Sequence, residues 1–126
     1  MTAENVFGYS TAIWQRFSEP VHGGSLAGAD VVSAEAGSAA ARALLRVQVR
    51  LDASTVEEAR FGAYGCPTTL AVGEWLASRL QGQMVAGLGA ISAAEIRAAL
   101  EIPDDRAHCA LMGEDVVRRL LTQVAP

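Results

Sequence analysis

An alternation of apolar and polar residues between positions 45 and 64 constrains the fold of this chain most. Within residues 45–51 the apolar positions are Leu45, Val47, Val49 and Leu51, and the polar positions are Arg46, Gln48 and Arg50. This period of two places one face of a strand in a core and the other in water. Residues 52–54 predict a turn, and residues 56–64 predict a second, antiparallel strand whose buried face carries Ala59, Phe61 and Ala63.

A hairpin with one solvated face predicts a small antiparallel sheet of about three strands, with helices packed on one face only. The third strand is expected at an edge within residues 27–41, where Val31 and Val32 are the strand-like pair. The fold class that follows is α+β. No repeat or linker interrupts residues 1–126, so one domain is expected.

Helical patterns flank the hairpin on both sides. Residues 9–17 predict a short helix that Ser10 could cap, and residues 68–80 predict a longer helix that ends near Gly82. Ser92 and Glu95 have the spacing of a capping box, whereas residues 83–91 read as a loop. The last helix is expected to start at Pro103, and its buried face comprises Cys109, Met112, Val116, Val117, Leu120, Leu121 and Val124.

Charge and hydropathy exclude several classes of function. The net charge of −4 and the scattered arginines argue against nucleic-acid binding, and no apolar run is long enough for a membrane span. No signal peptide is recognisable, so a cytoplasmic location with reduced thiols is expected. There is neither a nucleotide-binding glycine motif nor a Ser/His/Asp arrangement, and His22 is expected to be a surface histidine.

The two cysteines carry most of the remaining chemistry. Cys66 lies where a strand gives way to a helix, and the aligned amides of a helix start should lower the pKa of its thiol. His108 and Cys109 lie near the start of the last helix, where adjacent side chains point about 100° apart. Together they could flank one metal ion, or each cysteine could simply fill a buried space.

Four collinear blocks of the chain resemble the U-type iron–sulfur cluster assembly scaffolds, the family of IscU, SufU and the NifU N-terminal domain. Residues 9–25 look like the family's opening helix and N-P-R-N-V-G-S loop, and residues 45–49 resemble its M-K-L-Q-I strand. Residues 59–66 are similar to its A-K-F-K-T-F-G-C segment, and residues 108–116 to its H-C-S-x-L-A-E-D-A-I segment. The resemblance implies an IscU/SufE-like fold and a scaffold or carrier that is not an enzyme.

The resemblance also implies a site that binds an iron–sulfur cluster transiently, or zinc, through Cys66, His108 and Cys109. Ala41 stands where the family's first cluster cysteine belongs, and Ala43 stands where its aspartate belongs. A fourth ligand would have to come from outside, from a substitute such as Glu35 or His22, or from a second protomer.

The partners implied are a cysteine desulfurase as sulfur donor, with Cys109 the expected persulfide acceptor, and apo-proteins that accept clusters. Asp104 and Asp105 stand where the family has the apolar pair of its chaperone-binding stretch, which disfavours recognition by an Hsp70-type chaperone. Two alternatives stay open: a sulfur-acceptor partner of a desulfurase that no longer builds clusters, and a zinc-stabilised binding module.

Overall fold

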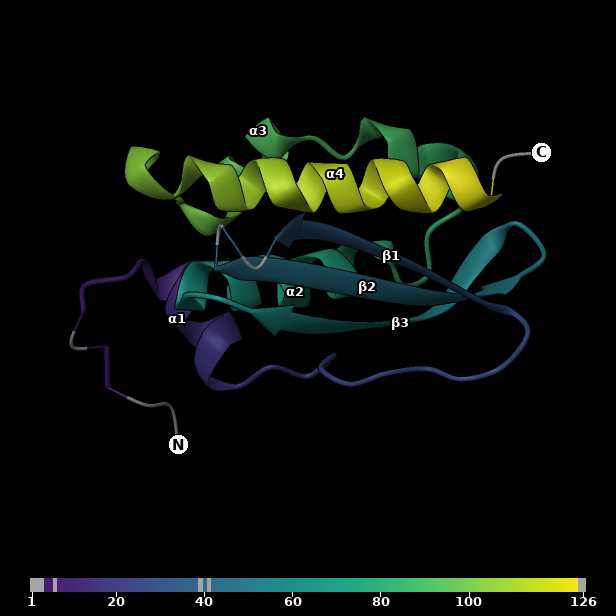
Figure 1. Cartoon of the computed structure of the whole chain (residues 1–126), viewed down its shortest axis with the longest axis horizontal. Coiled ribbons are helices and arrows are strands. Elements are labelled where there is room, and N and C mark those ends of the chain that lie inside the picture. Colours follow the sequence, from purple (N-terminus) through teal and green to yellow (C-terminus); the bar gives the residue numbers. More distant parts are fainter. Residues whose placement is uncertain (1–3, 6, 39, 41, 125–126) are drawn as a thin grey trace.

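The computed structural model describes residues 4–5, 7–38, 40 and 42–124. Three strands, four α-helices and two 3₁₀ helices follow one another in these residues (Figure 1). In chain order they are α1 (Thr11–Ser18), β1 (Val31–Ser38), β2 (Ala43–Asp52), β3 (Thr55–Tyr64), α2 (Pro67–Leu80), η1 (Val85–Ala90), α3 (Ala93–Leu100), η2 (Asp104–Arg106) and α4 (Ala107–Val124).

The strands form one antiparallel sheet in the order β1-β2-β3. Val47 lies opposite Ala34 on one side and Phe61 on the other, and all three are buried. Cross-strand register of this kind is fixed wherever one face of a sheet is apolar. The hairpin and the edge strand predicted from the alternation are therefore confirmed.

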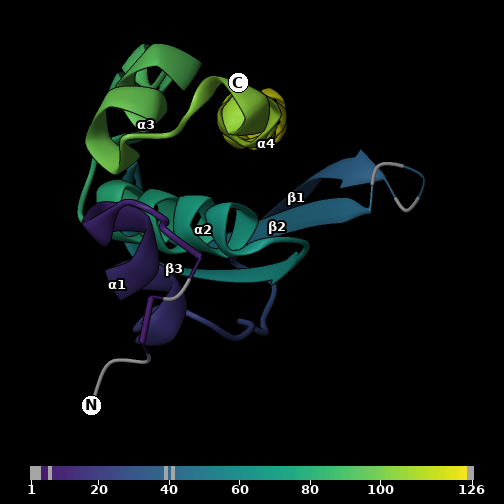
Figure 2. The ribbon, with the colours of Figure 1, turned by 90° about the vertical axis from the view of Figure 1, so that its left-hand side faces the viewer.

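Helices α2 and α4 cover one face of the sheet, as expected for this α+β fold. In Figures 1 and 2, α4 lies along β1 and β2, and α2 lies beside α4, over β2 and β3. Of the two shorter helices, α1 packs against α2 and α3 packs against α4. The side chains between these layers form one core. Its largest fully buried members include Leu45, Val47 and Val49 from β2, Val72 and Leu76 from α2, and Val116 and Leu120 from α4.

The opposite face of the sheet is less exposed than the alternation suggested. Figure 1 shows the segment between α1 and β1 crossing below the sheet, on the side away from α4. The Gln48 Oε1 atom accepts a hydrogen bond from Leu26 N (2.8 Å), and Arg50 Nη2 donates to Ala27 O (2.7 Å). These side chains hold a covering segment in place, so this polar face is not simply the wet side of a strand.

Local capping explains where several helices begin. The Ser10 Oγ atom accepts from Ile13 N at the start of α1, and Ser92 Oγ accepts from Glu95 N at the start of α3, as the sequence predicted. Gly82 follows α2 with a φ of 85°, which suits a glycine after a helix end. Two expectations need correction: η1 occupies most of the supposed loop 83–91, and the last helix begins at Ala107 after the separate turn η2.

None of the helices within the described residues is long and apolar enough to cross a membrane.

Candidate functional site

Cys66 lies at the junction between β3 and α2. Gly65 adopts a φ of 147°, and a Cβ added there would lie 2.9 Å from Thr69 Oγ1, so the tight approach of strand to helix requires glycine. Cys66 is then the N-cap residue of α2, and Pro67 occupies the first turn. The thiol is partly exposed and faces the free amides of the helix start.

Thr69 connects the two cysteines. Its Oγ1 atom is 3.7 Å from Cys66 Sγ and 3.6 Å from Cys109 Sγ, within hydrogen-bonding range of both sulfurs. The side chain is 1% exposed and sits in the first turn of α2. Thr69 is not among the site residues expected from the sequence, although a hydroxyl three residues after an N-cap cysteine is the signal that would have identified it.

Cys109 and His108 approach the same place from the first turn of α4. Cys109 is 0% exposed, whereas His108 is exposed, in keeping with the angle between adjacent helical residues. The His108 Nε2 atom is 3.6 Å from Cys109 Sγ. The fold therefore brings together Cys66, His108 and Cys109 from the ends of two separate helices.

The two thiols differ sharply in acidity. The hydrogen bond from Cys109, followed by bonds from the backbone and side chain of Thr69, lowers the pKa of Cys66 from the ordinary thiol value of 9.0 to about 4. Burial of Cys66 opposes this shift without cancelling it. A pKa of about 4 corresponds to a thiolate at neutral pH. The helix start predicted a lowered pKa for Cys66, but the largest cause of the shift is Cys109.

Cys109 behaves in the opposite way. Its hydrogen bond to Cys66, together with its burial, raises the pKa of the Cys109 thiol well above 9.0. A place near a helix start, which favours a thiolate at Cys66, therefore does not make Cys109 a low-pKa thiol. Two neighbouring thiols hold one negative charge more easily than two, and the more exposed sulfur, Cys66, carries it.

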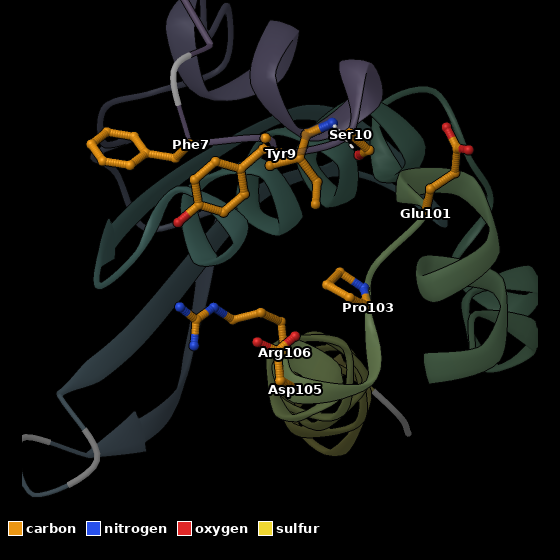
Figure 3. Close-up of a pocket in the computed structure, with 9 residues that line it drawn as sticks. Phe7, Tyr9, Ser10, Glu101, Pro103, Asp105 and Arg106 are labelled. Carbon is orange, nitrogen blue, oxygen red and sulfur yellow. Dashed lines mark hydrogen bonds between the residues drawn. The ribbon is translucent and has the colours of Figure 1, made fainter.

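A cavity of about 420 Å³ is lined by Arg106, whose guanidinium is close enough to Cys66 to feel its charge. Figure 3 shows Tyr9, from the segment before α1, facing Arg106 of η2 across it. The charge of Cys66, and then a hydrogen bond with Tyr9, raise the pKa of Arg106. The Arg106 guanidinium thus brings a positive charge to the cavity wall, within reach of the Cys66 thiolate.

The donors at this site suit zinc or an iron–sulfur cluster only in part. Thiolate sulfur and imidazole nitrogen are ligand types that both zinc and iron–sulfur clusters accept. Within the part of the chain that the structure describes, however, no three or more His, Cys, Asp or Glu side chains are grouped so as to hold a metal ion. The geometry is that of a thiol pair with an adjoining imidazole, and Ala41 lies outside the described residues.

The substitute ligands suggested for the fourth position lie elsewhere. The His22 Nδ1 atom is 2.7 Å from Glu74 Oε2, and Glu74 is eight residues, or about 12 Å, along α2 from Cys66. Glu35 lies between the core-facing Ala34 and Ala36, so it points to the sheet face opposite the thiols.

The prediction that His22 is a surface histidine was also wrong. Its side chain is only 16% exposed and pairs with Glu74, which is itself buried. The residues are 52 positions apart, so no local pattern pointed to the pair.

Comparison with known proteins places the chain in a family. The NifU-like N terminal domain family matches residues 8–124. The chain is 27% identical over 113 residues to the iron-sulfur cluster assembly scaffold protein IscU of Haemophilus influenzae, covering 87% of this chain and 90% of that protein. The identity to IscU of Escherichia coli K12 is also 27%, over 87% of this chain and 88% of that protein.

Solved structures share the fold. FiSufU from Fervidobacterium islandicum AW-1 superposes with a TM-score of 0.74 at 13% identity, covering 90% of this chain and 96% of that chain. The N-terminal NifU-like protein of Brucella abortus gives a TM-score of 0.73 at 17% identity, covering 92% of this chain and 95% of that chain. Because the family match spans nearly the whole sequence, this chain belongs to the NifU-like N-terminal domain family of U-type scaffolds.

Proposed function

We propose that this protein is an iron–sulfur cluster assembly scaffold that receives sulfur from a cysteine desulfurase and holds cluster or metal through Cys66, His108 and Cys109. The observation that carries the proposal is the meeting of the two thiols across Thr69, next to His108. Family membership and the names of the curated relatives support the same assignment. The protein acts as a carrier, and completed clusters pass to apo-protein acceptors.

Sulfur transfer from a desulfurase persulfide requires an accessible thiolate, since the thiolate is the nucleophile. The family resemblance assigns this role to Cys109. The solvent exposure of the two cysteines favours Cys66 as the first acceptor of sulfur, because Cys66 is partly exposed and Cys109 is 0% exposed. Sulfur that arrives at Cys66 has Cys109 as a near neighbour, because both thiols lie within 3.7 Å of Thr69 Oγ1.

Exposed apolar side chains support docking of a protein partner at this end of the molecule. Large exposed apolar residues in such a position commonly mark an interaction surface. Phe7 lines the cavity beside Arg106, Leu44 pairs with Tyr64 two residues before Cys66, and Leu111 follows Cys109 by two residues.

The alanine at position 41, in place of a ligating cysteine, accounts for transient binding of the cluster or metal ion. Three protein ligands leave one position open on a tetrahedral ion, so the fourth ligand comes from outside the chain. His108 is exposed, so its ring can turn toward an arriving ion without disturbing the core. The alternative of a sulfur acceptor that builds no cluster draws support from the alanine at position 41 and from the lack of a grouped set of metal donors among the described residues.

Anaerobic reconstitution with ferrous iron and sulfide tests the proposal. Wild-type protein is expected to show sulfur-to-iron charge-transfer absorption that a chelator removes readily, and Cys66→Ser is expected to lose it. Ala41→Cys restores the family's first cluster cysteine, so that the chain has three cysteines, and is expected to slow cluster loss to the chelator. Ala40→Cys, which adds a thiol at the neighbouring position, is the matched control and should resemble the wild type.

The remaining outcomes separate the alternatives. Persulfidation by a desulfurase with no bound cluster in any variant would support the sulfur-acceptor function. Stoichiometric zinc without sulfur transfer would support the zinc-stabilised module. Protein that binds neither metal nor cluster and accepts no sulfur would contradict all three.

A further inference from the structure

The two thiols are arranged one behind the other. Cys66 is partly exposed at the protein surface, whereas Cys109 is 0% exposed. Thr69 Oγ1 lies within 3.7 Å of both sulfurs, so the two thiols are neighbours on either side of one hydroxyl. The sequence contains no further cysteine. A sulfur atom attached to Cys66 therefore has one thiol neighbour within the chain, and that neighbour approaches from the interior.

Building on the proposed receipt of sulfur, we propose that Cys109 resolves a persulfide on Cys66, so that the protein releases sulfide and is left with a Cys66–Cys109 disulfide. The Cys109 sulfur attacks the inner sulfur of the Cys66 persulfide and forms the new S–S bond. The bond between that inner sulfur and the outer sulfur breaks, and the outer sulfur leaves with the electron pair. It takes up the Cys109 proton and departs as HS⁻.

The electrons and atoms of this step balance without any reactant from outside the chain. The outer sulfur is reduced from the sulfane to the sulfide state, and the two cysteine sulfurs are together oxidised by the same two electrons. One chain therefore releases one sulfide and accepts no further sulfur, because both of its cysteines are then in the disulfide. An external dithiol must reduce the disulfide before the next round.

The placement of the two sulfurs favours resolution over storage. Cys109 is buried and shares Thr69 Oγ1 with Cys66, which is partly exposed, so the outer sulfur of a Cys66 persulfide has room on the exposed side. An attack by Cys109 from the interior would then meet the inner sulfur opposite the leaving sulfur, which is the alignment that thiol–disulfide exchange requires. The inference adds a reductive step that supplies sulfide without a separate persulfide reductase.

The test loads fully reduced protein anaerobically in two ways, with a cysteine desulfurase plus cysteine and with sodium polysulfide. Released sulfide is measured after desulfurase loading, and the mass of the chain and of its peptides is measured after both. Wild type is expected to release one equivalent of sulfide and to lose the mass of two hydrogens, with a peptide linking Cys66 to Cys109. Unloaded wild type kept under the same conditions is expected to stay reduced.

Two variants make the test specific. Cys109→Ser is expected to keep one added sulfur on Cys66 and to release sulfide only after dithiothreitol is added. Cys109→Ala should behave alike, and circular dichroism checks that both are folded. Cys66→Ser is expected to form neither persulfide nor disulfide.

Persistence of the added sulfur on wild-type Cys66, or its appearance on Cys109, would overturn the inference. The proposed function fails separately: if the desulfurase loads no variant while polysulfide still drives the Cys66–Cys109 disulfide, the resolving step holds and the desulfurase partner is wrong. If the desulfurase loads Cys66 in wild type and in Cys109→Ser equally, without sulfide release, the partner holds and the resolving step is wrong.

Discussion

At the scale of single residues, burial decides how two similar thiols divide one charge. Cys66 and Cys109 both lie at helix starts, which the sequence indicated, and a helix start favours a thiolate. Only the structure adds that both sulfurs lie beside the Thr69 hydroxyl and that Cys109 is 0% exposed. A thiol donor beside an exposed acceptor then stabilises a single thiolate at Cys66.

Removing the donor should reverse much of this effect. Because the hydrogen bond from Cys109 is the largest cause of the low pKa of Cys66, Cys109→Ala is expected to raise that pKa from about 4 toward 9.0. The measurement is the rate of alkylation of Cys66 by iodoacetamide as a function of pH, in metal-free reduced protein. Cys109→Ser keeps a hydroxyl donor and should show a smaller rise. Identical profiles for the wild type and Cys109→Ala would contradict this account.

The same shift makes folding stability depend on pH. The pKa of Cys66 is about 4 in the folded chain and 9.0 for an ordinary thiol, so between these values the unfolded chain binds one more proton. The free energy of unfolding should therefore rise with pH from about 4 toward 9.0, and this contribution is lost as the pH falls through the folded value. Above 9.0 the raised pKa of Cys109 acts in the opposite direction.

Urea unfolding at a series of pH values, with a chelator present, checks this dependence. The difference in unfolding free energy between wild type and Cys66→Ser isolates the Cys66 contribution, since serine does not titrate in this range. A difference that stays constant between pH values of about 4 and 9 would show that Cys66 is not a thiolate in the folded protein.

At the scale of elements, Glu74 attaches the segment after α1 to α2. Its Oε1 atom accepts hydrogen bonds from Val21 N (2.8 Å) and His22 N (2.7 Å), and the next residues pair with the free edge of β3 through Phe61. A buried carboxylate with several donors is stable because charge-assisted hydrogen bonds replace its hydration. This one side chain thus fixes the segment that covers the outer face of the sheet.

Glu74→Ala should destabilise the protein by about 1–3 kcal/mol, because two backbone donors lose their acceptor. Thermal or urea unfolding measures the loss, and amide hydrogen exchange should increase at Val21, His22 and Gly24. Glu57→Ala, at an exposed position of β3, is the matched control and should change stability little. Equal losses in the two variants would mean that Glu74 does not anchor the segment.

Local patterns predicted the elements, and contacts between distant residues account for the errors. Alternation in residues 45–51 and the caps at Ser10 and Ser92 depend on neighbours in sequence, so the strands and helix starts could be read directly. The pairing of His22 with Glu74, and the hydrogen bond from Leu26 N to the Gln48 side chain, each join residues more than twenty positions apart. The high pKa of Cys109 likewise arises from a cysteine that only the fold brings near.

At the scale of the whole molecule, the two ends of the sheet have different surroundings. Strand β3 runs from Thr55, which pairs with Met84, to Tyr64, just before Cys66, a span of roughly 30 Å. Met84 (58%) and Leu111 (57%) are equally exposed apolar side chains, but only Leu111 is near the thiols. On α4, Leu111 is three residues after His108, so the two side chains are neighbours on the exposed side of the helix.

If a sulfur donor docks at the thiol end, a charge at Leu111 should block it and the same charge at Met84 should not. Leu111→Arg is expected to slow persulfidation of Cys66 by the desulfurase about tenfold, the effect of losing about 1.4 kcal/mol of interface energy. Persulfidation by polysulfide should be unchanged in both variants, because a small reagent needs no docking surface. Equal slowing by Leu111→Arg and Met84→Arg would show that added positive charge, and not the position of the apolar side chain, controls the encounter.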